Sequence, residues 1–161
     1  MRKQLIRTGM QAMLGMLAFL ARRPAMSGAT RVVTRCLAVL TVKAKSIGRA
    51  RDTEELGRLW QRSFPATKQV PIEAVTADTV YARIHTPCPL RGSGDVHACH
   101  RMMEFDRAVV GHAGGQFVVL ASQAEPGRTH CRVAMRLYGA DMADLVPAHA
   151  RFPEPVAGAS E

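Results

Sequence analysis

A chain of 161 residues with 47% hydrophobic residues is long enough for one domain with a modest core, and disorder is expected only at its ends. The net charge of +9 is uneven, because half of the 22 Lys and Arg residues lie in the first 51 positions, which contain no Asp or Glu. Four cysteines in a chain of this length and apolar content argue against a disulfide framework and predict reduced thiols in a cytoplasmic protein.

The basic first segment indicates contact with an anionic surface, lipid or nucleic acid, or else a solvated helical face. Residues 1–21 begin with basic side chains and then become apolar, until Arg22 and Arg23 end the apolar run. That run is far short of the ~20 residues a membrane-spanning helix needs. Its apolar residues share one face, which predicts an amphipathic helix that packs internally or lies on a membrane surface. A cleaved secretory signal is the third alternative, because small residues follow at 25–29.

Two more helices are predicted before the first strand. Apolar spacing predicts one over 30–48, with Cys36 on its apolar side as a buried structural thiol. The other residues of that side are Val32, Val33, Leu37, Leu40 and Ile47. Asp52 begins the next helix as its N-cap, and Pro65 ends it. Within that helix, Trp60 is expected to be a large core residue, with a place in the lining of a ligand pocket as the alternative.

From residue 70 the hydrophobic period changes from helical to alternating. The alternation predicts strands over 70–76, 79–86, 116–124 and 129–138. A helix is predicted over 96–113, capped by Ser93 or Asp95 and ended by two glycines. The fold class is therefore α+β: N-terminal helices, then an antiparallel sheet of about four strands with one long helix packed on it. The expected divisions are a basic helical segment (1–51), an α+β domain (52–145) and a flexible tail (146–161).

Soft and titratable side chains are dense between Cys88 and Cys131. Cys99 and Asp106 are seven residues apart on the predicted helix, so they project from nearly one face. A thiol near a helix N-terminus is favoured as the thiolate, and a carboxyl on an apolar helix side is either paired or protonated. One interpretation is therefore a nucleophilic site with Cys88 or Cys99, Asp106 and a histidine that no motif identifies.

Two other interpretations compete with a nucleophilic site. The first is a metal site, with Cys88, His97, Cys99, His100 and Cys131 as ligands. The spacings match no standard zinc pattern, so we expect neither a metal nor another cofactor. In the second interpretation the thiols are small core residues, the histidines lie at the surface, and Asp106 binds Arg107 or a backbone amide.

Three short motifs favour the nucleophilic site. They are TPCPL at 86–90, CHRMMEFD at 99–106 and GRTHCRV at 127–133. Through these motifs the chain resembles the L-2-amino-thiazoline-4-carboxylate hydrolase family over about residues 54–138. It departs from the family at Met103, where members often have a second helix cysteine, and at Val133, where they have an aromatic residue.

The resemblance implies hydrolytic opening of a cyclic amidine, a 2-amino-thiazoline, to an N-carbamoyl-cysteine product. It implies Cys88 and Cys99 as nucleophile candidates and Asp106 as the acid–base group or the partner of the substrate amidine. The residues that it implies for substrate binding are His100 and Cys131 in the pocket and Arg132 on the substrate carboxylate.

The same layout is similar to four-vinyl-reductase-type small-ligand-binding domains, which carry or sense hydrophobic molecules and are not necessarily enzymes. The alternative function is thus a non-catalytic small-ligand- or metal-binding module, docked to a membrane or a larger assembly through residues 1–45. In both cases the partner is a small molecule, and the location is cytoplasmic or peripheral at the membrane. Specific nucleic-acid binding is not expected, because no aromatic residues interleave with the basic ones.

Overall fold

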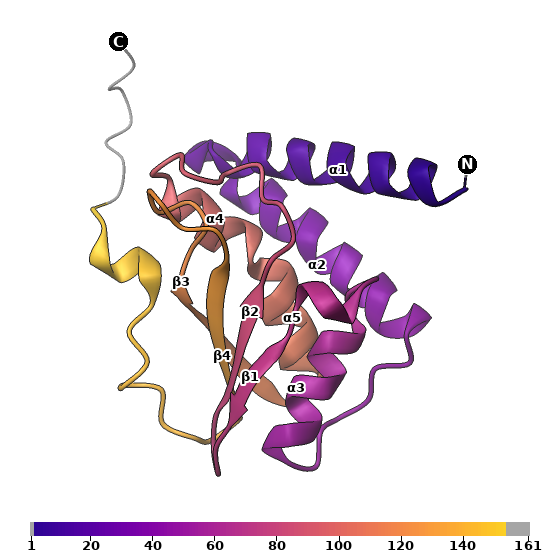
Figure 1. The fold of residues 1–161 in the computed structure, drawn as a ribbon, viewed down its shortest axis with the longest axis vertical. Helices are drawn as coiled ribbons and strands as arrows, with labels where there is room; N and C mark the ends of the chain where they lie inside the picture. The colour runs from indigo at the N-terminus through magenta and orange to yellow at the C-terminus, as the bar shows by residue number, and fades with distance from the viewer. Residues whose placement is uncertain (1, 154–161) are drawn as a thin grey trace.

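An antiparallel four-stranded sheet with helices on one face forms the protein in a computed structural model, which describes residues 2–153 apart from the side chains of 2–8, 10 and 11 (Figure 1). The strands in spatial order are β1 (Ile72–Val75), β2 (Val80–Ile84), β4 (Cys131–Leu137) and β3 (Gly115–Ala121). Each neighbouring pair is antiparallel. The predicted α+β class and the four strands are therefore confirmed, with the strands shorter at their ends than predicted.

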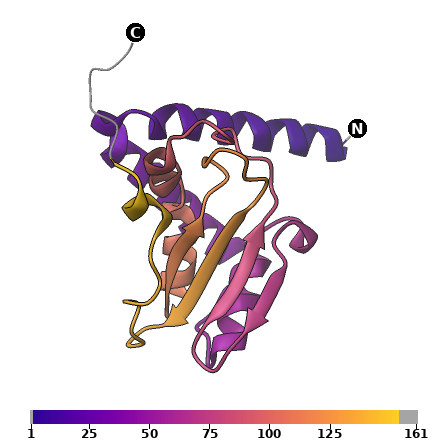
Figure 2. The ribbon, with the colours of Figure 1, turned by 60° about the vertical axis from the view of Figure 1, so that its left-hand side comes forward.

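Three helices form an inner layer behind the sheet, as the turned view shows (Figure 2). They are α3 (Thr53–Arg62), α4 (Val96–Met102) and α5 (Glu104–His112). The helix predicted over 96–113 is present, but it is divided at Met103, whose ψ of 7° leaves the helical range. Side chains cap two of these helices as predicted: Asp52 accepts a hydrogen bond from the Glu55 backbone N–H, and Asp95 accepts one from Ala98.

An outer layer of two helices covers the inner ones. It consists of α1 (Arg2–Ala21) and α2 (Ser27–Ala44), joined by a short 3-10 turn, η1 (Pro24–Met26). Helix α2 packs on α5, and α1 contacts α4 (Figure 1). The basic segment is therefore packed against the α+β domain along both of its helices.

The side of α2 that faces the domain coincides only in part with the predicted one, because Val33 and Leu37 are partly buried and Ile47 is buried as expected. Its buried residues are Thr30, Thr34, Ala38 and Val42. Cys36, predicted to be a buried thiol, is exposed, and so are Val32 and Leu40. Threonine can replace an aliphatic residue here because its hydroxyl is satisfied within the helix: Thr34 Oγ1 donates to the Thr30 carbonyl at 2.7 Å. The small inner side chains also let α2 approach α5 closely.

The core lies between α3, α5 and the sheet. Trp60 is fully buried there, as predicted, together with Leu56, Val109 and Met135. Gly115, at the start of β3, allows α3 to approach the sheet, because a Cβ at that position would lie 2.6 Å from Leu56 Cδ2.

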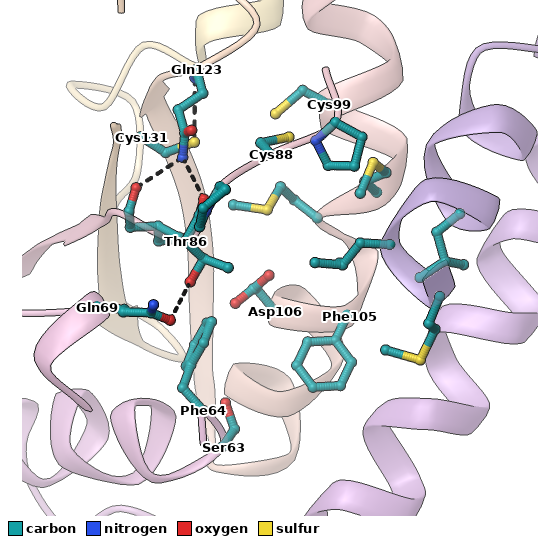
Figure 3. A pocket seen from close by; sticks show the side chains of 18 of the residues that line it. Ser63, Phe64, Gln69, Thr86, Cys88, Cys99, Phe105, Asp106, Gln123 and Cys131 are labelled. Carbon is teal, nitrogen blue, oxygen red and sulfur yellow. Dashed lines mark hydrogen bonds between the residues drawn. The ribbon is translucent and has the colours of Figure 1, made fainter. Parts of the chain in front are cut away.

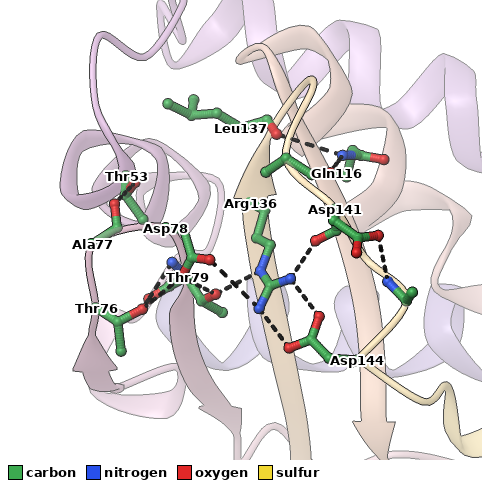
Figure 4. Close-up of polar contacts among 12 residues, drawn as sticks. Thr53, Thr76, Ala77, Asp78, Thr79, Gln116, Arg136, Leu137, Asp141 and Asp144 are labelled. Atoms are coloured by element: carbon green, nitrogen blue, oxygen red, sulfur yellow. Dashed lines mark hydrogen bonds and ion pairs between the residues drawn. The ribbon is translucent and has the colours of Figure 1, made fainter.

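The chain after β4 runs back along the β3 side of the sheet (Figure 2), and its Leu145 packs against Val118 and Ala134 on the face opposite the helices. Arg136, although it is on a strand, is buried, and its guanidinium binds both carboxylate oxygens of Asp144 at 2.6 and 2.8 Å and donates to Thr79 Oγ1 at 2.6 Å (Figure 4). Of the segment expected to be a flexible tail, residues 146–153 include a 3-10 helix, η3 (Ala148–Arg151), with Ala148 buried. Residues 154–161 lie outside the part that the structure describes.

Candidate functional site

A cavity of about 280 Å³ lies between the outer helices and the inner layer (Figure 3). Its apolar lining includes Met13, Leu14, Leu17, Leu37, Phe64, Ile84, Met102, Met103 and Phe105. Among the described residues, no Lys, Arg or His belongs to the lining. Ligand pockets usually measure roughly 300–1,000 Å³ and are mainly apolar with a few polar groups, so this cavity suits one small molecule.

Four of the six residues predicted for the site line this cavity. They are Cys88, Cys99, Asp106 and Cys131. In Figure 3 the three thiols lie in the upper part of the view and the Asp106 carboxyl lies below them. The spacing of seven residues in the sequence thus did place Cys99 and Asp106 on one face, even though the helix is divided between them.

The other two predicted residues lie elsewhere. The His100 ring stacks on His149, with ring centroids 3.8 Å apart, beside a separate small hollow against η3. Burial, with help from the neighbouring Arg107 charge, lowers the pKa of His100 to about 4. Arg132 projects from the opposite face of the sheet, where it pairs with Glu73 at 3.4 Å. Since side chains alternate along a strand, Arg132 and Cys131 cannot both face the cavity.

Asp106 is the ionisable group that distinguishes the cavity. The Trp60 indole N–H donates a hydrogen bond to Asp106 Oδ1 at 2.8 Å. Burial raises the pKa of Asp106 to about 6, although the Trp60 hydrogen bond opposes that rise. Arg107, expected as a partner of Asp106 in one interpretation, instead binds Glu104 at 2.9 Å. The carboxyl is therefore held by one neutral side-chain donor in apolar surroundings, and the charge of nearby Arg107 lowers its pKa too little to offset burial.

The three thiols differ in how easily they ionise. Burial raises the pKa of Cys88. The Cys99 thiol donates to Cys131, which raises the pKa of Cys99 and lowers that of Cys131. Cys131 Sγ also accepts a hydrogen bond from the Gln123 backbone N–H at 3.3 Å. Cys131, predicted only to line the pocket, is therefore the thiol best prepared to become a thiolate.

Two residues of the site have roles that were not predicted. Buried Gln123 donates from Nε2 to the carbonyls of Ile84 and Thr86, both at 3.0 Å, and so ties the end of β2 to the loop after β3 (Figure 3). No sequence pattern marks it. Trp60 was expected in the core but not as the donor to Asp106. A buried indole N–H needs a hydrogen-bond acceptor, and this was the one feature of the sequence that indicated a polar partner for Trp60.

The residues proposed as metal ligands are separated in the structure. His97 binds the Phe152 carbonyl through Nε2 at 3.0 Å and is not part of the lining, whereas the three thiols are. Within residues 2–153, no group of three or more His, Cys, Asp or Glu side chains is arranged to hold a metal ion.

Fold and site together define an α+β domain with a mainly apolar pocket that could hold a small molecule. Comparisons with protein-family models, curated proteins and solved structures find no match. The function is therefore inferred from the chemistry of the pocket.

Proposed function

We propose that the protein binds a small, largely apolar molecule that carries a protonated amine or amidine, and that Asp106 is the counter-charge for that group. The observation that carries this proposal is a buried carboxyl on the wall of an apolar cavity, with no cationic side chain among the described lining residues. Of the described side chains, Trp60 alone donates a hydrogen bond to the carboxyl. A ligand can supply the missing donors, and an amidine offers two N–H groups to a carboxylate.

The free-energy cost of Asp106 supports a functional role. With a pKa of about 6, the Asp106 carboxyl is ionised at neutral pH inside apolar surroundings, which destabilises the folded state. An apolar or amide side chain would serve stability better at this position. Titratable groups kept at such a cost are concentrated in functional sites.

Calorimetric titration with linear alkylamines of increasing length, each paired with the alcohol of the same length, tests the proposal. The wild-type protein should bind the amine at least about tenfold more tightly than the alcohol, because a hydrogen bond to a charged group contributes roughly 1.5–3 kcal/mol. Asp106→Asn should bind both members of a pair equally. Equal binding of amine and alcohol by the wild-type protein would contradict the proposal.

Hydrolysis of a cyclic amidine, as the family resemblance implies, is a second candidate, favoured by three thiols that line the same cavity as the carboxyl. The water oxygen adds to the amidine carbon of a 2-amino-thiazoline and the bond from that carbon to the ring sulfur breaks. The two protons of the water end on the ring nitrogen and on the departing sulfur. Asp106, with a pKa of about 6, suits proton transfer near neutral pH. In a two-step route Cys131 Sγ first adds to the amidine carbon as the bond from that carbon to the ring sulfur breaks, and its proton passes to the ring nitrogen. The water oxygen then displaces Cys131 from that carbon and returns its proton, so the net balance is the one given above.

The pocket favours a different substrate from the one that the resemblance implies. Arg132, expected on the substrate carboxylate, is on the opposite face of the sheet and pairs with Glu73. A carboxylate in the cavity would have no cationic partner among the described lining residues. We therefore expect the thiazoline without the carboxylate to be the better substrate.

Mass spectrometry of products from purified protein and both thiazolines tests the hydrolytic candidate. Cys131→Ser and Asp106→Asn should abolish turnover, whereas Cys36→Ser, which alters an exposed thiol outside the cavity, should not change it. Amine binding without turnover of either thiazoline would reject hydrolysis and leave the binding function.

A further inference from the structure

Helix α2 turns three of its larger aliphatic side chains away from the domain, while Leu37 and Val42 stay on the inner side. Val32, Val39 and Leu40 are each more than half exposed, at 63%, 53% and 63%. Their spacing of seven and eight residues puts them on one side of the helix, opposite the small residues that face α5. An ordinary surface helix has the reverse arrangement.

Helix α1 adds to this exposed apolar surface. Its Met16 and Phe19 are also more than half exposed. We call these two residues, with Val32, Val39 and Leu40, the outer apolar face. Five of the eight large hydrophobic side chains that are exposed in the described part of the chain thus lie on two adjoining helices, and such a concentration marks an interaction surface.

The charge around the outer apolar face selects one kind of partner. Residues 1–51 contain no Asp or Glu, so nothing in this segment offsets its basic side chains. Lys43 and Lys45 are exposed at the end of α2, and Arg23 is exposed at the turn before it. The Arg23 guanidinium also lies 3.7 Å from the centre of the Phe19 ring. Aliphatic and aromatic side chains bordered by cations are typical of helices at an anionic lipid surface.

The position of α2 favours a surface contact over a crossing. The segment Pro24–Ala44 has a mean hydropathy of 1.2, and by length and composition it is the one helix in the described residues that could cross a membrane. Yet α2 packs on α5 along its inner side, and Arg35 pairs with Glu104 at 2.7 Å. These contacts tie α2 to the domain and leave its other side for a bilayer.

We propose that the outer apolar face docks the protein on a bilayer that contains anionic lipids. The same two helices form one wall of the cavity, through Leu17 of α1 and Leu37 of α2. Docking on this face brings the cavity wall that α1 and α2 form next to the bilayer in which an apolar amine dissolves, and this last point rests on the proposed function. Docking itself does not depend on it.

Vesicle co-sedimentation of the full chain tests the docking, using phosphatidylcholine vesicles and an equimolar mixture of phosphatidylcholine and phosphatidylglycerol. The wild-type protein should sediment with the mixed vesicles and much less with phosphatidylcholine alone. Val39→Glu should lower the partition coefficient about tenfold or more, because it puts a carboxylate against anionic lipid. Val146→Glu is the matched control: Val146 is 52% exposed against 53% for Val39, lies outside the two helices, and changes the net charge equally. It should sediment almost as the wild-type protein does.

Three results would overturn the proposal. One is an absence of wild-type binding to the mixed vesicles. Another is an equal effect of Val39→Glu and Val146→Glu, which would mean that net charge alone binds the lipid. The third is a dimer in sedimentation velocity that Val39→Glu dissociates, which would mean that a second copy covers the face. Asp106→Asn should sediment as the wild-type protein does, because the carboxyl is not part of the outer apolar face. Vesicle sedimentation therefore tests docking alone, and the amine titration tests the ligand proposal.

Discussion

The indole nitrogen of Trp60 lies 2.8 Å from Oδ1 of Asp106, and this hydrogen bond joins α3 to α5 at the wall of the cavity. Both side chains are buried, and the donor is neutral. The Trp60 hydrogen bond therefore orients the carboxyl without cancelling its charge. That arrangement leaves the charge for a ligand.

Asp106 makes stability depend on pH in a direction that can be checked. Its pKa is about 6 in the folded protein against an ordinary value of 3.8, so the folded state holds the proton more strongly than the unfolded state. The contribution of this group to the free energy of unfolding is thus fully present below about pH 4 and is lost as the pH rises through about 6. As the pH rises from about 4 to above 6, the free energy of unfolding of Asp106→Asn should therefore increase by up to ~3 kcal/mol relative to that of the wild-type protein. Urea unfolding at several pH values measures the difference, and parallel curves would contradict it.

Trp60→Phe removes the donor and keeps an aromatic ring. We expect a loss of ~1.5–3 kcal/mol in the free energy of unfolding at pH 8, where Asp106 is ionised, because hydrogen bonds to charged groups contribute that much. The loss should be smaller at pH 4, where the carboxyl is protonated. Unfolding followed by circular dichroism at the two pH values tests this, since Trp60 is the only tryptophan. An identical loss at both would mean that packing alone is affected.

Thiol alkylation should follow exposure. Cys36 is exposed, Cys88 is half-buried, and Cys99 and Cys131 are buried. Iodoacetamide should therefore modify Cys36 first and Cys88 more slowly, by a factor of about 10 or more, because burial also raises the Cys88 pKa. Peptide mapping by mass spectrometry gives the order, and a bound alkylamine should slow Cys88 further. Labelling of Cys99 as fast as that of Cys36 in the folded protein would contradict the packing of the cavity.

Gly115→Ala should destabilise the protein by at least ~1–3 kcal/mol, the usual cost of overpacking. Its Cβ would lie 2.6 Å from Leu56 Cδ2 and 2.8 Å from the Arg136 carbonyl oxygen, and the backbone atom cannot move aside cheaply. Gly28→Ala is the control, because nothing lies within 4 Å of that Cβ. It should be neutral or stabilise by ~0.5 kcal/mol. Urea unfolding followed by Trp60 fluorescence compares them, and equal effects would contradict the close approach of α3 to the sheet.

Local patterns in the sequence were enough to predict the α+β class. Alternation marked four strands, and Asp52 and Asp95 marked the starts of two helices, because these features depend on near neighbours alone. The shared face of Cys99 and Asp106 followed from helical spacing in the same way. The alternation also put Cys131 and Arg132 on opposite faces, which could have removed Arg132 from the predicted site.

The orientation of α2 could not be predicted, because hydrophobic spacing says which residues share a side but not which side meets the domain. Buried Thr34, whose hydroxyl is satisfied by its own helix, belongs to an inner side that is shifted from the expected one, so that Leu37 stays inside while Val32 and Leu40 are exposed. Nor does spacing reveal pairs from distant segments. Trp60 and Asp106 are 46 positions apart, and Gln123 and Ile84 are 39 apart. Such pairs arise only when the layers assemble.

The role of Asp106 as a counter-charge is best measured by NMR of its side-chain carboxyl carbon in isotope-labelled protein, titrated with pH. Without ligand the pKa should be about 6. With the tightest-binding alkylamine present it should fall clearly below that value, because a nearby positive charge stabilises the carboxylate. The alcohol of the same length should leave it at about 6 or raise it. A pKa of Asp106 that the amine does not lower would contradict the proposed site.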